Sequence, residues 1–368
     1  MIPVFEPVIT EADVQAVMET LRRGEISGSF GTTINSFERA FADYLGVPHA
    51  VAVSSGTAAL HVAVRAAGIQ PGDEVLVSSS TNIATALAVV HNGAIPVPVD
   101  SEPDTWNLDL DVIESLITPK TRAILPVHLF GTPVDMDALM TIADRHGLIV
   151  IEDVAEALGT RVRGRLAGTF GKLSCFSFYA NKVITTGEGG MVVTSDADIA
   201  ERLRLLRNLG FTTPRFKHDE LGFNYRMTGL QAALGLSQLG RINEIVETKR
   251  SIARHYHQAL AGINALKLSV EPEWALCVPW MFSSEVRPDA SVTRDELMLR
   301  LHARGIDTRT FFCPMNQQPA LQRVRGFVAR PCPVADQLWQ RGLYLPSSLS
   351  LTPAQICEIG RTIKECLA

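Results

Sequence analysis

The sequence lacks the features that would place this protein on nucleic acid, in a membrane or outside the cell. Its formal net charge is −5 and it has no long basic run, so nucleic acid is not an expected partner. No apolar stretch reaches the roughly 20 residues that a membrane-spanning helix needs. The first residues have neither the charged nor the apolar region of a secretory signal. We therefore expect a cytoplasmic protein.

Cysteine is scarce and scattered. The six cysteines form no C-x-x-C pair and no Cys/His group at zinc spacing, so reduced thiols are expected and no metal site is predicted. They are Cys175, Cys277, Cys313, Cys332, Cys357 and Cys366. Repeats and low-complexity tracts are also absent.

Between residues 50 and 195, short apolar runs alternate with helical stretches. The runs are continuous rather than alternating in polarity, which is typical of strands that are buried on both faces. The sequence therefore predicts an α/β fold with a mostly parallel, seven-stranded sheet and helices on both faces. The predicted strands are 51–53, 74–77, 95–99, 123–127, 148–151, 175–178 and 191–194.

The C-terminal third has a different character, which predicts a smaller α+β domain. Capping boxes begin at Thr10 and Thr293, and Thr352 precedes a proline at the first helical position. One long helix is expected from Leu230 to Leu260, crossing between the two parts. We expect a large domain over residues 1–240 and a small domain over residues 241–368.

Lys182 is the strongest candidate for chemistry among the seven lysines. It lies between an apolar strand and the glycine-rich turn Gly187–Gly190. An amine there would be partly desolvated, which lowers its pKa and suits imine formation with a carbonyl. The alternative is an ordinary surface lysine at a strand end.

Two further segments complement this lysine. Asp153 follows a buried strand, where open α/β sheets bind ligands, and its carboxylate can pair with a protonated pyridine nitrogen; the alternative is a capping or metal-binding role. The segment Ser54–Leu60 joins a strand to a helix, so its backbone N–H groups and the Thr57 hydroxyl can hold a phosphate. The alternative is a plain N-cap by Ser54 or Ser55. Together the three supply the attachments that pyridoxal 5'-phosphate (PLP) needs.

The chain resembles the DegT-type (DegT/StrS) sugar aminotransferases over nearly its whole length. These are PLP-dependent transferases of fold type I, the aspartate aminotransferase-like fold, and they act on nucleotide-linked keto sugars. Six segments carry the resemblance: Gly24–Gly28, Ser55–Leu60, Pro126–Gly131, Glu152–Asp153, Thr185–Met191 and Gly222–Thr228.

The resemblance implies roles for individual residues. Lys182 would form the Schiff base and shuttle protons, and Asp153 would face the pyridinium nitrogen. Asn224 would reach the phosphate from a partner subunit, which implies a homodimer, with a tetramer left open. The other implied cofactor contacts are Ser55, Gly56, Thr57, Asn82, Glu156 and Ser177. The implied substrate contacts are Ser27, Gly28, Glu188, Arg226 and Asn316.

Two positions depart from the family pattern. Asn82 stands where members usually carry an aromatic residue that stacks on the cofactor, and an amide has less apolar area for stacking. Asn316 stands where many members have a histidine near the sugar, and an amide cannot titrate near neutral pH.

The segment Phe178–Met191 is most similar to the branch of the family that makes GDP-perosamine. The implied reaction moves an amino group from glutamate to GDP-4-keto-6-deoxymannose, with pyridoxamine 5'-phosphate as the intermediate form of the cofactor. Three alternatives stay open: a different nucleotide sugar, a PLP-dependent sugar dehydratase, or a non-catalytic protein with this fold. Relatives that dehydrate sugars carry histidine in place of the Schiff-base lysine, whereas this chain keeps Lys182.

Overall fold

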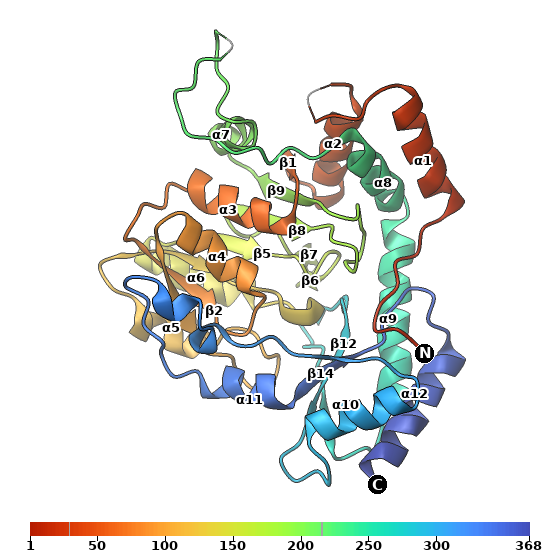
Figure 1. Cartoon of the computed structure of the whole chain (residues 1–368). Coiled ribbons are helices and arrows are strands. Elements are labelled where there is room, and N and C mark those ends of the chain that lie inside the picture. Colours follow the sequence, from red (N-terminus) through yellow and green to blue (C-terminus); the bar gives the residue numbers. More distant parts are fainter. Residues whose placement is uncertain (29, 215) are drawn as a thin grey trace.

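The computed structural model describes residues 1–28, 30–214 and 216–368 and is built around a seven-stranded sheet (Figure 1). The strand order is β1-β9-β8-β5-β4-β2-β3. The strands are β1 (His49–Val53), β2 (Glu74–Ser78), β3 (Ile95–Val99), β4 (Thr121–Leu125), β5 (Ile149–Asp153), β8 (Leu173–Ser177) and β9 (Gly190–Thr194). Only β9 pairs antiparallel, with β8 and with β1; the other pairings in this sheet are parallel. The predicted mostly parallel α/β sheet is confirmed.

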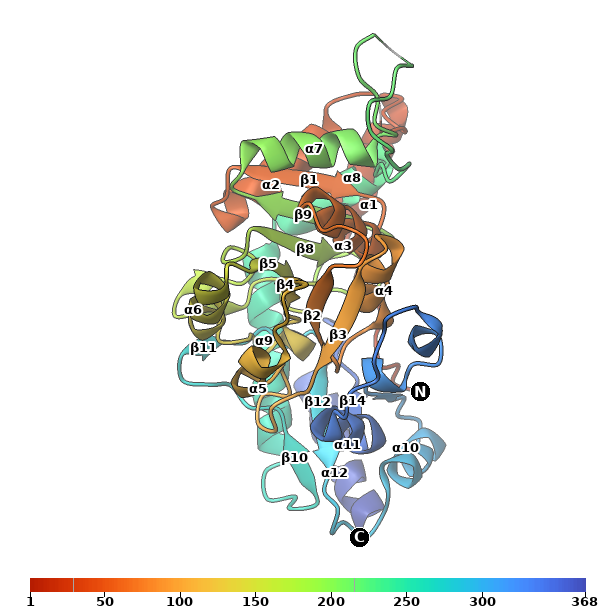
Figure 2. The ribbon, with the colours of Figure 1, turned by 90° about the vertical axis from the view of Figure 1, so that its left-hand side faces the viewer.

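Both faces of this sheet are covered, which explains the continuous apolar runs of its strands. Along β1, Val51 and Val53 pack in the cluster that contains helices α3 and α7, while Ala50 and Ala52 pack in the cluster that contains α2 and α8. Figure 2 shows the helices on either side of the sheet. The helices of this part are α1 (Glu11–Arg22), α2 (Thr33–Leu45), α3 (Gly56–Ala66), α4 (Ile83–His91), α5 (Leu110–Leu116), α6 (Met136–His146), α7 (Ala197–Arg207) and α8 (Gly229–Leu239).

The predicted continuous helix from Leu230 to Leu260 is wrong. Two helices take its place, α8 and α9 (Ile242–Ala259), because Arg241 leaves helical geometry with φ −117° and ψ 22°. The Arg241 guanidinium donates to Asp13 Oδ2 at 3.0 Å, and Asp13 belongs to α1. This ion pair and Gly240, the C-cap of α8, give a physical reason for the break. The glycine is a local stop signal that the prediction passed over, whereas the ion pair depends on tertiary contact.

A second, antiparallel sheet with the order β10-β12-β14-β13 forms the C-terminal part (Figure 1). Its predicted α+β character is confirmed. The strands are β10 (Leu266–Leu268), β12 (Phe282–Val286), β13 (Arg309–Thr310) and β14 (Gly342–Leu345). The helices are α9, α10 (Arg294–Ala303), α11 (Pro333–Arg341) and α12 (Pro353–Leu367), with short 3-10 turns η2 (Met315–Gln317) and η3 (Leu321–Arg323).

A small third sheet links the two parts. It has the order β11-β6-β7, with β6 (Arg161–Val162), β7 (Arg165–Leu166) and β11 (Ala275–Leu276). The 3-10 turn η1 (Leu129–Gly131) follows β4 in the chain. The predicted capping boxes at Thr10 and Thr293 are present, and Thr352 caps α12. Within the described ranges, no helix is long and apolar enough to span a membrane.

Candidate active site

A cavity of about 400 Å³ lies at the edge where β1, β5 and β8 end. Because these strands run parallel to one another in the sheet, their carboxyl ends open into the same space. The sequence-predicted residues that line the cavity are Ser55, Gly56, Thr57, Asn82, Asp153, Glu156, Ser177, Lys182 and Glu188. The structure therefore brings together the helix start at Ser55, the strand end at Asp153 and the segment of Lys182, which are far apart in the chain.

One end of the cavity is the start of α3. Ser55 is its N-cap, with the side-chain oxygen accepting from the Ala58 N–H at 3.1 Å. A Cβ atom added to Gly56 would lie 2.7 Å from the Ser177 Cβ, so glycine permits the close approach of β8 to this helix start. The first N–H groups of a helix have no acceptor inside it, and those of Gly56 and Thr57 can therefore bind an anion. Capping by Ser55 and anion binding are compatible here.

Asp153 forms the floor of the cavity. Its Oδ2 accepts from the Thr85 hydroxyl at 2.9 Å, and its Oδ1 accepts from the Ala155 N–H at 3.1 Å. Thr85 is itself 2.8 Å from the Thr81 hydroxyl. Burial raises the pKa of Asp153, and these hydrogen bonds and the nearby Lys182 oppose that rise. The carboxylate is therefore oriented by fixed donors and would be stabilised further by a cation in the cavity.

Lys182 and Glu156 form a close, largely buried pair. Lys182 Nζ is 3.8 Å from Glu156 Oε1, with side-chain exposures of 13% and 6%. Burial lowers the pKa of Lys182, although Glu156 and Asp153 favour its charged form. Burial also raises the pKa of Glu156 to about 7, while its Oε2 accepts from the Phe130 N–H at 2.9 Å. Burial therefore favours the neutral form of both side chains.

Three aromatic residues on the far side of the cavity were not predicted as site residues: Trp280, Phe312 and Tyr344. Lys182 Nζ lies 3.9 Å from the centre of the Trp280 ring. Trp280 and Tyr344 are more than 90 positions from Lys182 in the sequence, and Tyr344 belongs to β14 of the second sheet. No local pattern connects them to the glycine-rich turn, so sequence reasoning had no signal for them.

The DegT/DnrJ/EryC1/StrS aminotransferase family matches residues 7–364. The chain belongs to this family. It is 43% identical over 370 residues to the GDP-perosamine synthase of Caulobacter vibrioides, covering 100% of this chain and 98% of that protein. Among solved structures it is similar to DesV of S. venezuelae in complex with a ketimine intermediate (39% identity, TM-score 0.89, 96% and 93% coverage). It is also similar to the PMP-form of the putative sugar aminotransferase Spr1654 from Streptococcus pneumoniae (28%, TM-score 0.94, 99% and 97%).

The predicted family and enzyme class are thus confirmed: the chain is a PLP-dependent sugar aminotransferase. The two residues that depart from the family pattern have different surroundings in the structure. Asn82 is exposed and is the N-cap of α4, where its Oδ1 accepts from the Ala84 N–H at 3.0 Å. Its amide lines the cavity as a helix cap.

Asn316, the second departure, is buried outside the lining of this aminotransferase cavity. Its Oδ1 accepts from the Ser79 hydroxyl at 3.1 Å, and its Nδ2 donates to Asp336 Oδ1 at 3.0 Å. The amide therefore ties η2 to the end of β2 and to α11. In this chain Asn316 connects elements behind the cavity wall.

Four other predicted residues of the aminotransferase lie together, away from the cavity of their own chain. A Cβ atom on Gly28 would lie 2.8 Å from the Arg226 Cβ, so the loop carrying Ser27 and Gly28 packs on the segment of Arg226. Arg226 Nη1 donates to Asn208 Oδ1 at 2.9 Å, and the exposed Asn224 pairs with Asn208 in a β-bridge. None of these residues is among the cavity lining.

The neighbouring carboxylates Glu152 and Asp153 have different surroundings: Asp153 lines the cavity and Glu152 does not. Glu152 is fully buried and faces away from Asp153 in the strand. It accepts from the N–H groups of Gly168 (2.8 Å), Phe170 (2.8 Å) and Gly171 (2.6 Å), and it contacts His128 Nε2 at 3.1 Å. The His128 Nδ1 accepts from a backbone N–H, so its proton resides on Nε2 and is donated to Glu152.

Replacing Glu152 by alanine should destabilise the protein strongly. The change leaves three backbone N–H groups and the buried His128 without their acceptor, and losing one partner of such a network costs about 3–5 kcal/mol. Urea unfolding followed by circular dichroism measures the loss. The matched control is Glu247→Ala, which removes an exposed carboxylate paired with Arg254 and should leave the midpoint unchanged. Equal midpoints for both variants would contradict this role for Glu152.

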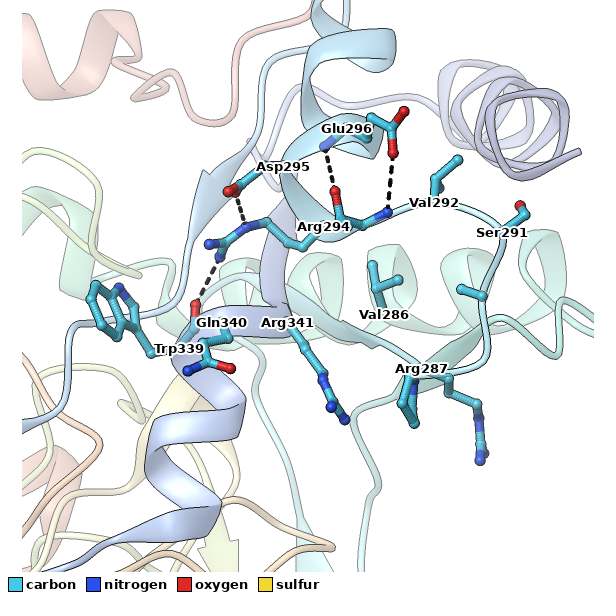
Figure 3. A pocket seen from close by; sticks show the side chains of 13 residues that line it. Val286, Arg287, Ser291, Val292, Arg294, Asp295, Glu296, Trp339, Gln340 and Arg341 are labelled. Carbon is cyan, nitrogen blue, oxygen red and sulfur yellow. Dashed lines mark hydrogen bonds and ion pairs between the residues drawn. The ribbon is translucent and has the colours of Figure 1, made fainter.

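A larger cavity of about 630 Å³ lies elsewhere, between α10 and the end of α11 (Figure 3). Its buried Arg294 donates to the carbonyls of Trp339 and Gly342 at 2.9 Å and to Asp295. None of the described residues lining it is a lysine, histidine or cysteine. It therefore offers no amine for imine chemistry, and the candidate active site is the smaller cavity. Among the described residues, no group of His, Cys, Asp and Glu side chains could hold a metal ion.

Proposed function

We propose that this aminotransferase moves an amino group from glutamate to GDP-4-keto-6-deoxymannose and so makes GDP-perosamine. The observation that carries the proposal is full-length similarity, at 43% identity, to a protein named GDP-perosamine synthase. The cavity supports the reaction class, because it holds a buried amine, a buried carboxylate and a helix start around one space. The departure at Asn82, which lines the cavity, is the reason to keep a second candidate, transfer to a different nucleotide-linked keto sugar.

PLP fits this cavity in three places. The start of α3, with Ser55, Gly56 and Thr57, together with Ser177, would hold the phosphate. Asp153, whose buried carboxylate is held by the Thr85 hydroxyl and the Ala155 N–H, would face the ring nitrogen. Lys182 would hold the cofactor through its amine, with Glu156 beside the ring hydroxyl. When bound, PLP supplies an electron sink that stabilises a carbanion at the reacting carbon.

The side chains of this chain then have separate tasks. Lys182 Nζ would take the proton from the donor carbon and deliver it to the cofactor carbon, and in the second half-reaction it would carry a proton from that carbon to the sugar carbon. A positioned side chain accelerates such transfers by about 10²–10⁴-fold. Asp153 keeps the ring nitrogen protonated through its fixed negative charge. The aromatic side chains of Trp280, Phe312 and Tyr344 exclude water from the amine, which strengthens electrostatic interactions there.

We further propose that the active unit is a homodimer with shared sites. Asn224, Ser27, Gly28 and Arg226 lie outside the cavity of their own chain, which supports their reaching the cavity of a partner. Exposed apolar side chains in the neighbouring loops, Phe30 at 74% and Leu221 at 82%, support burial against a second copy. Glu188 would contact the substrate from within the chain. The proposed boundary at residue 240 then places the cavity between a large and a small domain.

A panel of nucleotide-linked keto sugars tests the proposal. The purified protein with PLP and glutamate is given GDP-4-keto-6-deoxymannose and, separately, the UDP- and dTDP-linked 4-keto-6-deoxyglucoses, and each product is identified by mass. We expect an amino sugar from the GDP substrate at the highest kcat/KM. A higher kcat/KM for another sugar would support the second candidate. A deoxygenated product without nitrogen would indicate dehydration instead.

The raised pKa of Glu156 predicts a pH dependence of stability in the protein without cofactor. Its carboxyl has a pKa of about 7 when folded and near 4.5 when unfolded, so between these values the folded state binds more protons. Stability therefore falls as pH rises from 5 to 8, by about 2–3 kcal/mol from this group. Urea unfolding of the wild type and Glu156→Gln at both pH values measures the difference. If the glutamine variant shows the same fall, Glu156 is not its source.

A further inference from the structure

Trp280 is held rigidly although it lies in a loop before β12. Its side chain is 3% exposed, and its indole Nε1 donates to the Asn181 carbonyl at 2.6 Å. Its backbone N–H donates to the Phe130 carbonyl at 3.1 Å. Its own carbonyl accepts from Lys249 Nζ at 2.9 Å. Both the backbone and the ring are thus fixed by hydrogen bonds from three other segments.

The lysine that holds the Trp280 carbonyl is itself unusual. Lys249 is 1% exposed, and its ammonium also donates to the Ser347 carbonyl at 2.6 Å, so it joins α9 to the segment before β12 and to the segment after β14. Phe130 and Phe312 lie nearly parallel to the indole, with interplanar angles of 7° and 4° and ring centres 6.2 and 6.5 Å away. These contacts leave the ring little freedom to turn.

The fixed ring faces the reactive amine. Lys182 Nζ is 3.9 Å from the ring centre and 3.8 Å from Glu156 Oε1, so the amine lies between an aromatic face and a carboxylate. The face of an indole carries partial negative charge and attracts an ammonium group at this distance. The other titratable side chains that line the same cavity are Asp153 on β5, Tyr344 on β14, and Tyr179 and Glu188 on either side of Lys182 in the chain.

We propose that Trp280 is a positioning residue, which holds the free Lys182 amine over its indole face beside Glu156 and so favours the protonated amine. The inference rests on the proposed role of Lys182. A transaminase releases this lysine in every cycle, and the freed amine must stay near the reacting carbon while it carries a proton. The indole face attracts the amine without adding a further carboxylate, which would hold the proton more tightly.

The test titrates Lys182 in the protein without cofactor. Brief labelling with acetic anhydride at pH values from 6 to 11, followed by peptide mass spectrometry, gives the fraction of each lysine that is unprotonated. In Trp280→Leu we expect the midpoint of Lys182 to fall by about 0.5–1 pH unit, because the loss of a cation–π contact disfavours the charged form. Trp280→Phe, which keeps an aromatic face, should show a smaller fall.

Two further proteins separate electrostatics from packing. Tetrafluorotryptophan placed at position 280 alone keeps the shape and the N–H but cancels the negative charge of the ring face, and it should also lower the midpoint. Trp274→Leu removes a tryptophan whose partner is Arg163, 5.3 Å from its ring, and should leave Lys182 unchanged. If Trp280→Leu does not fold, the protein with tetrafluorotryptophan still allows the Lys182 midpoint to be measured.

An unchanged or raised Lys182 midpoint with tetrafluorotryptophan would overturn the proposal, because packing alone would then account for Trp280. This outcome is distinct from failure of the proposed function. Lys182 can be titrated whether or not it binds PLP, and the sugar panel is read separately. A lowered midpoint together with a slower release of the donor proton, measured by exchange from α-deuterated glutamate, would support the positioning role.

Discussion

Lys182→Ala is expected to abolish amino transfer. The variant loses the amine that we propose holds the cofactor and acts as the base, 3.8 Å from Glu156. The loss should therefore exceed the roughly 10²–10⁴-fold that general acid–base catalysis alone contributes. Product mass after long incubation with glutamate and a nucleotide-linked keto sugar measures the residual rate. We expect no amino sugar above the uncatalysed background.

Two controls make this result specific to the amine. Lys172→Ala changes an exposed lysine ten positions away and should keep the wild-type rate. Methylamine added to the Lys182→Ala protein should restore part of the activity, since a small amine can enter the cavity left by the side chain. Turnover by Lys182→Ala near the wild-type rate would show that the reaction uses another group.

Asp153→Asn is expected to have the second largest effect. The amide keeps the shape of the side chain but has no charge to keep the ring nitrogen protonated, so we expect kcat to fall by at least about 10²-fold. Thr85→Val removes only the hydroxyl that orients Asp153 and should lower kcat by about tenfold, the size of one hydrogen bond to a charged group. Steady-state rates on the best sugar of the panel measure both.

Asp153→Asn should lower kcat without lowering the stability of the protein. Burial raises the pKa of Asp153, which means that the folded protein without cofactor holds this charge unfavourably. Thermal unfolding of Asp153→Asn at pH 8 should therefore occur at a temperature no lower than that of the wild type. A large drop in stability that accompanies the drop in kcat would mean that Asp153 is structural, and its assignment to the ring nitrogen would lose support.

Much of the sheet could be predicted from the sequence because its signals are local. Strand β5 contains the continuous apolar run Ile149–Ile151 that marks it as buried in the sheet. The capping boxes at Thr10 and Thr293 mark helix starts within four residues. Asp153 and the segment of Gly56 could be placed in one site for the same reason. Each directly follows a strand or begins a helix, and the ends of parallel strands share one edge.

The features that were not predicted depend on contacts between distant parts of the chain. The break after α8 accompanies an ion pair between Arg241 and Asp13, 228 positions apart. Trp280 reaches Lys182 only through the packing of a loop from the C-terminal part. The hydrogen bonds of Asn316 go to Ser79 and Asp336, which no spacing rule connects.

The most direct test of the account is to ask which amine binds the cofactor. The purified protein is mixed with PLP, reduced with borohydride and digested, and the pyridoxyl group is located among the seven lysines by peptide mass. We expect one stoichiometric label, on Lys182, in the wild type and no stoichiometric label on any lysine of Lys182→Ala. A label on another lysine, or no retained cofactor, would contradict it.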